Sequence, residues 1–134
     1  MFIILLPFET PRWMILPLAF AVGFSIDMFN NTAGMHAAAC VFIAFARPWL
    51  IKRYTPITGY ENVNAPSLSE LGVVWFALFT LTVIFIHHSI YYFLQVFWMN
   101  DVGYLLLKIF LSTLVSTLLI VIFAFLFAKR KVKR

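Results

Sequence analysis

Charged residues are scarce in this sequence. Asp, Glu, Lys and Arg make up 11% of the 134 residues, whereas a typical soluble domain carries roughly 25%. Hydrophobic residues make up 63%, well above the roughly 45–50% of a soluble domain. A water-soluble fold has too little polar surface to cover so much apolar side chain. The composition therefore excludes an ordinary soluble protein and favours one that spans a lipid bilayer.

A cysteine pair and the common catalytic motifs are also missing. The single cysteine, Cys40, lies inside an apolar run and has no second cysteine with which to form an intramolecular disulfide. The sequence has no Cys-Xaa-Xaa-Cys pair, no glycine-rich phosphate loop and no Ser–His–Asp spacing. Asp27 can be drawn as an intramembrane dyad with His36 or His88, but nothing in the sequence singles out that pair. We therefore expect neither an enzyme nor a bound cofactor.

Four apolar segments are long enough to cross a bilayer, which takes about 20 residues. Thr10 and Pro11 suit the cap and first position of the first helix, and 67–70 (Ser-Leu-Ser-Glu) matches a capping box before the third. Polar turns at 30–32 and 100–101 are short enough to make the helices that they join antiparallel. We expect residues 1–134 to form a single all-α domain, an antiparallel transmembrane helix bundle. Its predicted spans are about 12–29, 34–51, 68–97 and 102–128.

The basic residues predict the orientation of the bundle. They lie at the start of the first span, at the end of the second and in the tail at 129–134, whereas the turns around Asn31 and Asn100 contain no Lys or Arg. Positive charge favours the cytoplasmic side. The two short turns are therefore expected outside, and the long loop and the C-terminus inside. The net charge of +5 is expected to favour anionic lipid headgroups rather than nucleic acid.

Polar residues inside a span are costly and need an explanation. Ala19, Gly23 and Asp27 recur at a spacing of four, which places them on one helix face where small residues let another helix approach closely. One interpretation makes Asp27 a buried acid at a helix or ligand contact. The other makes it an interfacial residue that supports the turn at Asn30 and Asn31.

The other polar candidates lie in the second, third and fourth spans. Lys108, Ser112 and Ser116 also share a face. Lys108 is at a depth that allows a pair with Asp27, although snorkelling to the outer interface is slightly favoured. His88 and its neighbour His87 point about 100° apart on a helix and make a poor bidentate metal pair. Together with His36 they give only a weak metal signal, so no metal site is predicted.

Five short motifs in the first half of the chain are similar to those of a known family. They are Leu6-Pro7-Phe8-Glu9-Thr10-Pro11-Arg12-Trp13, Gly23-Phe24-Ser25-Ile26-Asp27, Gly34-Met35-His36-Ala37-Ala38, Arg47-Pro48 and Gly59-Tyr60-Glu61. With these motifs the first half resembles the rod shape-determining MreD family, in particular its Bacteroidetes members. The second half matches that family only in hydropathy and length.

The resemblance implies a non-enzymatic subunit of the bacterial cell-elongation machinery in the inner membrane. Its partners would be an MreC-like periplasmic scaffold and, through it, MreB and the RodA–penicillin-binding protein synthase. It also implies a fold similar to the substrate-binding subunits of energy-coupling-factor vitamin transporters, so a small-molecule transporter subunit is the alternative function. Family members usually begin with one or two further helices. Residues 1–8 are accordingly expected to be the end of a longer helix or a short interfacial segment.

Overall fold

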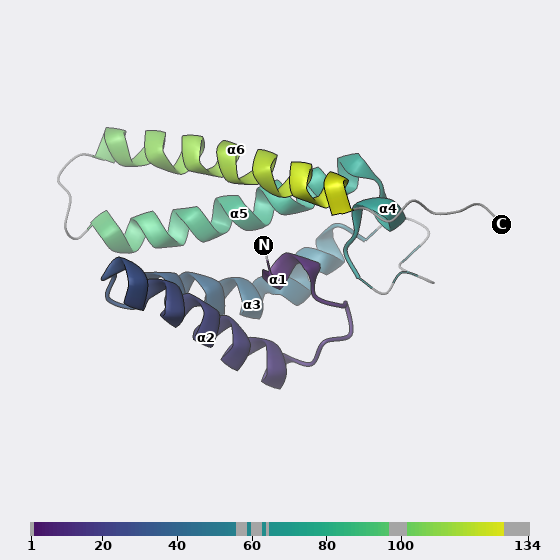
Figure 1. Ribbon diagram of the computed structural model, residues 1–134, viewed down its shortest axis with the longest axis horizontal. Coiled ribbons are helices and arrows are strands. Elements are labelled where there is room, and N and C mark those ends of the chain that lie inside the picture. The colour runs from purple at the N-terminus through teal and green to yellow at the C-terminus, as the bar shows by residue number, and fades with distance from the viewer. Residues whose placement is uncertain (1, 56–58, 60–62, 64, 97–101, 128–134) are drawn as a thin grey trace.

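The computed structural model describes residues 2–55, 59, 63, 65–96 and 102–127, and the regular structure in this part of the chain consists of helices, without a strand. Its helices are α1 (Phe2–Leu5), α2 (Arg12–Asn30), α3 (Met35–Arg53), α4 (Leu68–Leu71), α5 (Val73–Gln95) and α6 (Val102–Phe127) (Figure 1). Four of them, α2, α3, α5 and α6, are long and apolar enough to cross a membrane. The prediction of an all-α fold with four apolar helices of membrane-spanning length is confirmed for the described residues.

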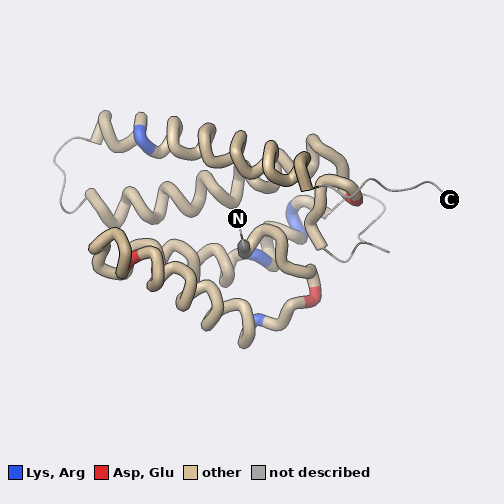
Figure 2. The backbone as a smooth tube through the Cα atoms, in the orientation of Figure 1, with Lys and Arg blue, Asp and Glu red and all other residues tan. Residues whose placement is uncertain are grey.

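The four long helices form two antiparallel hairpins. α2 packs on α3 and α5 packs on α6, and the hairpins meet where α3 contacts α5 (Figure 1). The turn between α2 and α3 lies at the same end of the bundle as the end of α5 and the start of α6, and we call this the turn end. The start of α2 and the end of α3 lie at the opposite end, together with α4. Lys and Arg of the described chain lie towards that opposite end, apart from Lys108 (Figure 2).

The third predicted span is two helices rather than one. Gly72 separates α4 from α5 with φ 84° and ψ 163°, a conformation that is essentially restricted to glycine. The predicted capping box is wrong in its bonding, because Ser67 precedes α4 but makes no side-chain cap hydrogen bond. Similarly, Pro11 rather than Thr10 caps α2, and the Thr10 hydroxyl donates to the Pro7 carbonyl at 2.8 Å. The predicted span ends at 97 and 128 and the turn at 100–101 lie outside the described residues.

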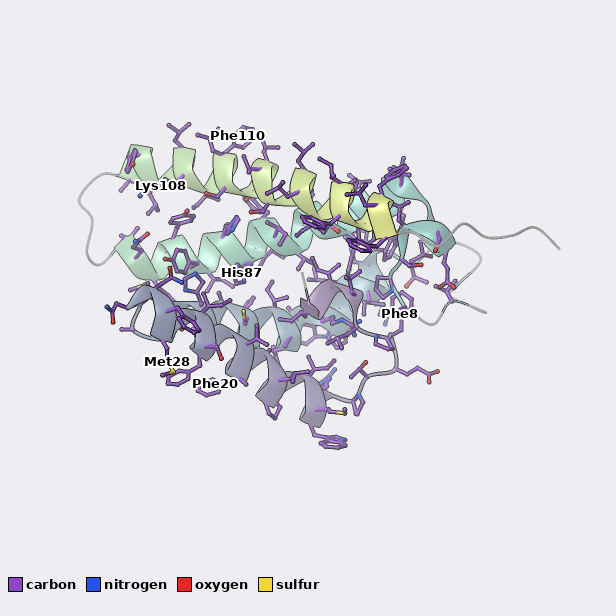
Figure 3. The ribbon with its side chains drawn as sticks, in the orientation of Figure 1. Phe8, Phe20, Met28, His87, Lys108 and Phe110 are labelled. Carbon is purple, nitrogen blue, oxygen red and sulfur yellow. The ribbon has the colours of Figure 1, made fainter. Side chains whose placement is uncertain are left out.

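The buried core lies between the hairpins and close to their crossing. One cluster joins residues from α1, α3, α5 and α6: Ile4, Ile43, Phe76, Phe79, Val83, Ile84 and Ile120. A second cluster ties α2 to α3 through Ile15, Ala19, Cys40 and Ala44. The outer faces of α2 and α6 carry exposed large apolar side chains, such as Phe20 and Phe110, which point away from the bundle (Figure 3). Such faces suit a hydrocarbon surrounding, in which outward apolar residues carry no penalty.

Candidate functional site

Two small-residue faces form the contact between α2 and α3. Ala19, Gly23 and Asp27 are all buried on the side of α2 that faces α3. A Cβ atom on Gly23 would lie 2.5 Å from the Ala37 Cα and 2.7 Å from the His36 carbonyl oxygen. Both are backbone atoms that cannot rotate away. Gly23 is therefore a point at which the two helix backbones approach closely, and no larger residue fits there without moving α3.

Asp27, which belongs to α2, caps the N-terminus of α3. The cap residue of α3 is Gly34, which has φ 81° and no side chain to bond the first amides of the helix. The Asp27 carboxylate takes that role: Oδ1 accepts from the His36 N–H at 3.0 Å and Oδ2 from the Ala37 N–H at 2.9 Å. A carboxylate at a helix N-terminus also interacts favourably with the helix dipole.

Two side chains complete the ring of donors around this carboxylate. The Thr32 hydroxyl donates to Asp27 Oδ1 at 2.5 Å, and His36 Nδ1 lies 2.9 Å from the same oxygen. Asp27 is only 3% exposed, so protein atoms cover most of its side chain. The carboxylate is thus buried at the contact between α2 and α3, and it also bonds Thr32 in the turn between them. Asp27 therefore has features of both interpretations, the buried acid and the residue that supports the turn.

A polar cavity opens beside this cluster at the turn end. It has a volume of about 520 Å³ and lies between the α2–α3 turn on one side and α6 on the other, with α5 along it. The side chains around it are Asn30, His36, His87, His88, Tyr91, Tyr92, Leu111, Ser112, Val115 and Ser116. His36 stands against Tyr91, with ring centroids 4.2 Å apart. Because its Nδ1 is held by Asp27, Nε2 is the ring nitrogen that remains for other partners.

Neutral hydrogen bonds fix the α6 wall of the cavity to α5. His88 Nδ1 lies 3.3 Å from the Thr113 hydroxyl, and the Tyr92 and Ser112 hydroxyls are 3.0 Å apart. Thr113 is 3% exposed. In hydrocarbon, hydrogen bonds of this kind help to hold neighbouring helices together.

The structure does not contain the contact between Asp27 and Lys108 that the sequence left open. Within the described part of the chain Asp27 pairs with His36 and not with Lys108. Lys108 lies at the turn end of α6, where its ammonium group stands 4.6 Å from the centre of the Tyr104 ring (Figure 3). That contact is a cation–π interaction at the end of a span, in line with the alternative of an interfacial lysine.

The three histidines do share one cavity, although adjacent positions on α5 were expected to separate them. Even so, the described residues contain no cluster of three or more His, Cys, Asp or Glu side chains arranged to hold a metal ion. Their rings instead lie against each other and the tyrosines. The ring centroids of His87 and His88 are 5.8 Å apart, and those of His88 and Tyr92 are 6.0 Å apart.

Sequence reasoning missed the structural part played by Arg47. In the sequence, Arg47 was used only to predict which end of the second span is cytoplasmic. In the structure its side chain is 3% exposed and faces the core. Its Nε donates to the Ile3 carbonyl at 3.1 Å, and Nη2 donates to the Leu6 carbonyl and to the Pro7 carbonyl at 3.2 Å. Arg47 therefore holds α1 and the segment after it against α3. One signal was available, because Arg47 follows the buried Ile43 by four residues and shares its helix face.

No family model, curated protein or solved structure matches this chain significantly.

Proposed function

We propose that this protein is a non-enzymatic membrane subunit of the bacterial cell-elongation complex, similar to MreD, with its C-terminal tail in the cytoplasm. One observation carries the proposal: residues that make the sequence resemble that family form one connected structural unit. Gly23 allows the backbones of α2 and α3 to approach closely, and Asp27 caps α3 through the amides of His36 and Ala37. Gly34 adopts the left-handed conformation that this turn requires.

The chemistry of the Asp27 cluster favours a structural role over catalysis. In a catalytic triad the acid holds one histidine nitrogen and the nucleophile bonds the other. Here Asp27 and the Thr32 hydroxyl both contact Nδ1 of His36, at 2.9 Å and 3.1 Å. The histidine therefore does not lie between an acid and a nucleophile. The arrangement fits a rigid connection between two helices that presents a fixed surface to a partner.

The expected partner is an MreC-like periplasmic scaffold, with MreB and the RodA–penicillin-binding protein synthase associated through it. The test is copurification of the tagged chain from membranes of its native host. We expect an MreC-like protein to be recovered with the chain, and recovery to fall for Asp27→Ala but not for Ser25→Ala. Ser25 lies on the same helix, is exposed and bonds only its own helix, at the Ala21 carbonyl. Absence of any MreC-like protein from the purified material would reject the proposal.

A small-molecule transporter subunit is the second candidate, because the polar cavity has the right size. Ligand pockets usually measure about 300–1,000 Å³, and this one measures about 520 Å³. A role like that of the vitamin-binding subunits of energy-coupling-factor transporters predicts recovery of an ATPase module in the same copurification. Recovery of that module in place of an MreC-like protein would decide for the transporter.

A further inference from the structure

A smaller apolar cavity lies beside the polar one and shares His87 with it. This second cavity has a volume of about 150 Å³, and its walls are apolar except for His87. His87 lines both cavities and lies between α5 and α3 (Figure 3). The deep end is closed by Ile3 and Ile4 of α1. The residues around the second cavity are Ile3, Ile4, Val22, Ile26, Cys40, Ile43, Val83, Ile84 and His87.

The two cavities follow the same faces of three helices. Towards the turn end each face changes from apolar to polar within about one turn. On α2 the lining residues are Val22, Ile26 and then Asn30; on α3 they are Ile43, Cys40 and then His36; on α5 they are Val83, Ile84 and then His87, His88, Tyr91 and Tyr92. Spacings of three and four keep such residues on one side of a helix. The two cavities therefore adjoin at His87, where the polarity of the lining changes, and we call the pair the cleft.

The lining sets the chemistry of what the cleft can bind. Among the described residues that line the two cavities, none is Lys, Arg, Asp or Glu. A charged group would therefore meet no oppositely charged side chain on these walls, which is costly in a membrane-embedded site. Imidazole, hydroxyl and amide groups instead offer several donors and acceptors to a neutral polar molecule. The apolar end is about as large as a dry protein cavity of roughly 150 Å³ that accepts benzene.

We propose that this cleft is a binding site for a small amphiphile with a neutral, hydroxyl-rich head and one short apolar group. The head occupies the polar cavity, against the rings of His36 and Tyr91, which are tilted by 39° to each other. The apolar group lies between α2, α3 and α5 below His87. Such a molecule arrives either as the headgroup of a membrane lipid or as a free solute, and both sources share this chemistry. The inference does not depend on the role in cell elongation.

The test uses the full chain in lipid nanodiscs and three probes. n-Octyl-β-D-glucoside carries a neutral sugar head on an alkyl chain, glucose is the head alone, and sodium octyl sulfate carries the same chain on a charged head. The readout is the histidine ring NMR signals. We expect saturable shifts of the His36 and His87 signals with octyl glucoside and much weaker shifts with glucose. Equal shifts with octyl sulfate, or no saturable shift with octyl glucoside, would overturn the proposal.

A fourth arm separates the two sources. A glucosyl diacylglycerol is incorporated into the nanodisc before the titration with octyl glucoside. If the lipid reduces the octyl glucoside shifts, the site takes lipid headgroups. If octyl glucoside still binds with undiminished affinity, the site takes free solutes of the same chemistry.

Two matched pairs of variants locate the binding. Ser116→Ala removes one hydroxyl from the polar cavity, whereas Ser89→Ala removes one from α5 that bonds the Phe85 carbonyl and does not line the cleft. Loss of one hydrogen bond should weaken octyl glucoside binding about three- to tenfold for Ser116→Ala only. Val22→Phe should block the apolar end, whereas Ala21→Phe, on the exposed side of α2, should not. Equal affinities within both pairs, with circular dichroism showing intact helices, would reject the cleft as the site.

Discussion

Replacing Asp27 by alanine tests the link between α2 and α3 most directly. The substitution removes the acceptor of the His36 and Ala37 amides, which lie at the start of α3. An unsatisfied buried amide costs about 1–3 kcal/mol. The two amides together predict a loss of about 2–6 kcal/mol in the free energy of unfolding. Loss of an ordinary exposed helix cap costs only about 0.5–2 kcal/mol.

The loss of stability for Asp27→Asn should lie between that of a lost exposed cap, about 0.5–2 kcal/mol, and that of Asp27→Ala, about 2–6 kcal/mol. The amide side chain keeps one acceptor oxygen, but its NH₂ group then faces an N–H group of α3, and two donors cannot bond each other. The measurement is reversible unfolding of the purified chain in mixed micelles, followed by circular dichroism. Ser25→Ala is the control on the same helix and should change stability by less than about 0.5 kcal/mol. A loss below about 1 kcal/mol for Asp27→Ala would refute the capping argument.

A double-mutant cycle of Asp27→Ala with Lys108→Met tests whether Asp27 and Lys108 interact. Lys108 contacts the Tyr104 ring and not Asp27. The two changes should therefore be additive within about 0.3–0.5 kcal/mol. A larger coupling energy would show that Asp27 and Lys108 interact after all.

Three further predictions concern packing, the N-terminal segment and topology. Gly23→Ala should destabilise the bundle, because backbone atoms of α3 occupy the space, although alanine is otherwise better in a helix by about 1 kcal/mol. The control Gly103→Ala, exposed at the start of α6, should be neutral or stabilising, and equal melting temperatures for both variants would contradict the close contact. Arg47→Met should release the segment from α1 to Glu9 and speed its cleavage in limited proteolysis, unlike Lys52→Met, which alters an exposed residue. In a Cys40→Ser background, single cysteines at Asn31 and Asn100 should react from outside and those at Tyr60 and Lys131 from inside; labelling of position 60 from outside would reverse the orientation.

The lengths and places of the spans were accessible from sequence because a bilayer sets them. The first predicted span, 12–29, differs from α2 by one residue, and the second, 34–51, is shifted from α3 by one or two. The break at Gly72 was not predicted, since a lone glycine in an apolar run is compatible with a continuous helix. Its φ of 84° depends on how α4 packs against α5, which a local pattern does not contain.

The candidate site was predicted only in part, for a geometric reason. Periodicity placed Ala19, Gly23 and Asp27 on one face, but the partners of Asp27 depend on the turn. That turn needs left-handed backbone at both Asn31 and Gly34, with φ 53° and 81°. Lys108 was proposed from depth alone, and depth does not say on which side of the bundle a helix lies. α6 packs on α5, so Lys108 and Asp27 belong to different hairpins, and α6 and α2 lie on opposite sides of the bundle (Figure 1).

The two hairpins are held together by different chemistry, and this difference positions the cleft. α2 and α3 are linked at the turn end by a carboxylate that caps backbone amides, while at the other end Arg47 bonds the carbonyls of the α1 segment. α5 and α6 are linked at the turn end by neutral hydroxyl and imidazole bonds, which in membranes contribute about 0.6 kcal/mol each on average. Since α6 packs on α5 and α2 packs on α3, the α6 wall is the more weakly held side of the cavity. Any change in the width of the polar cavity should therefore come from movement of α6, with the α2–α3 hairpin as the fixed side.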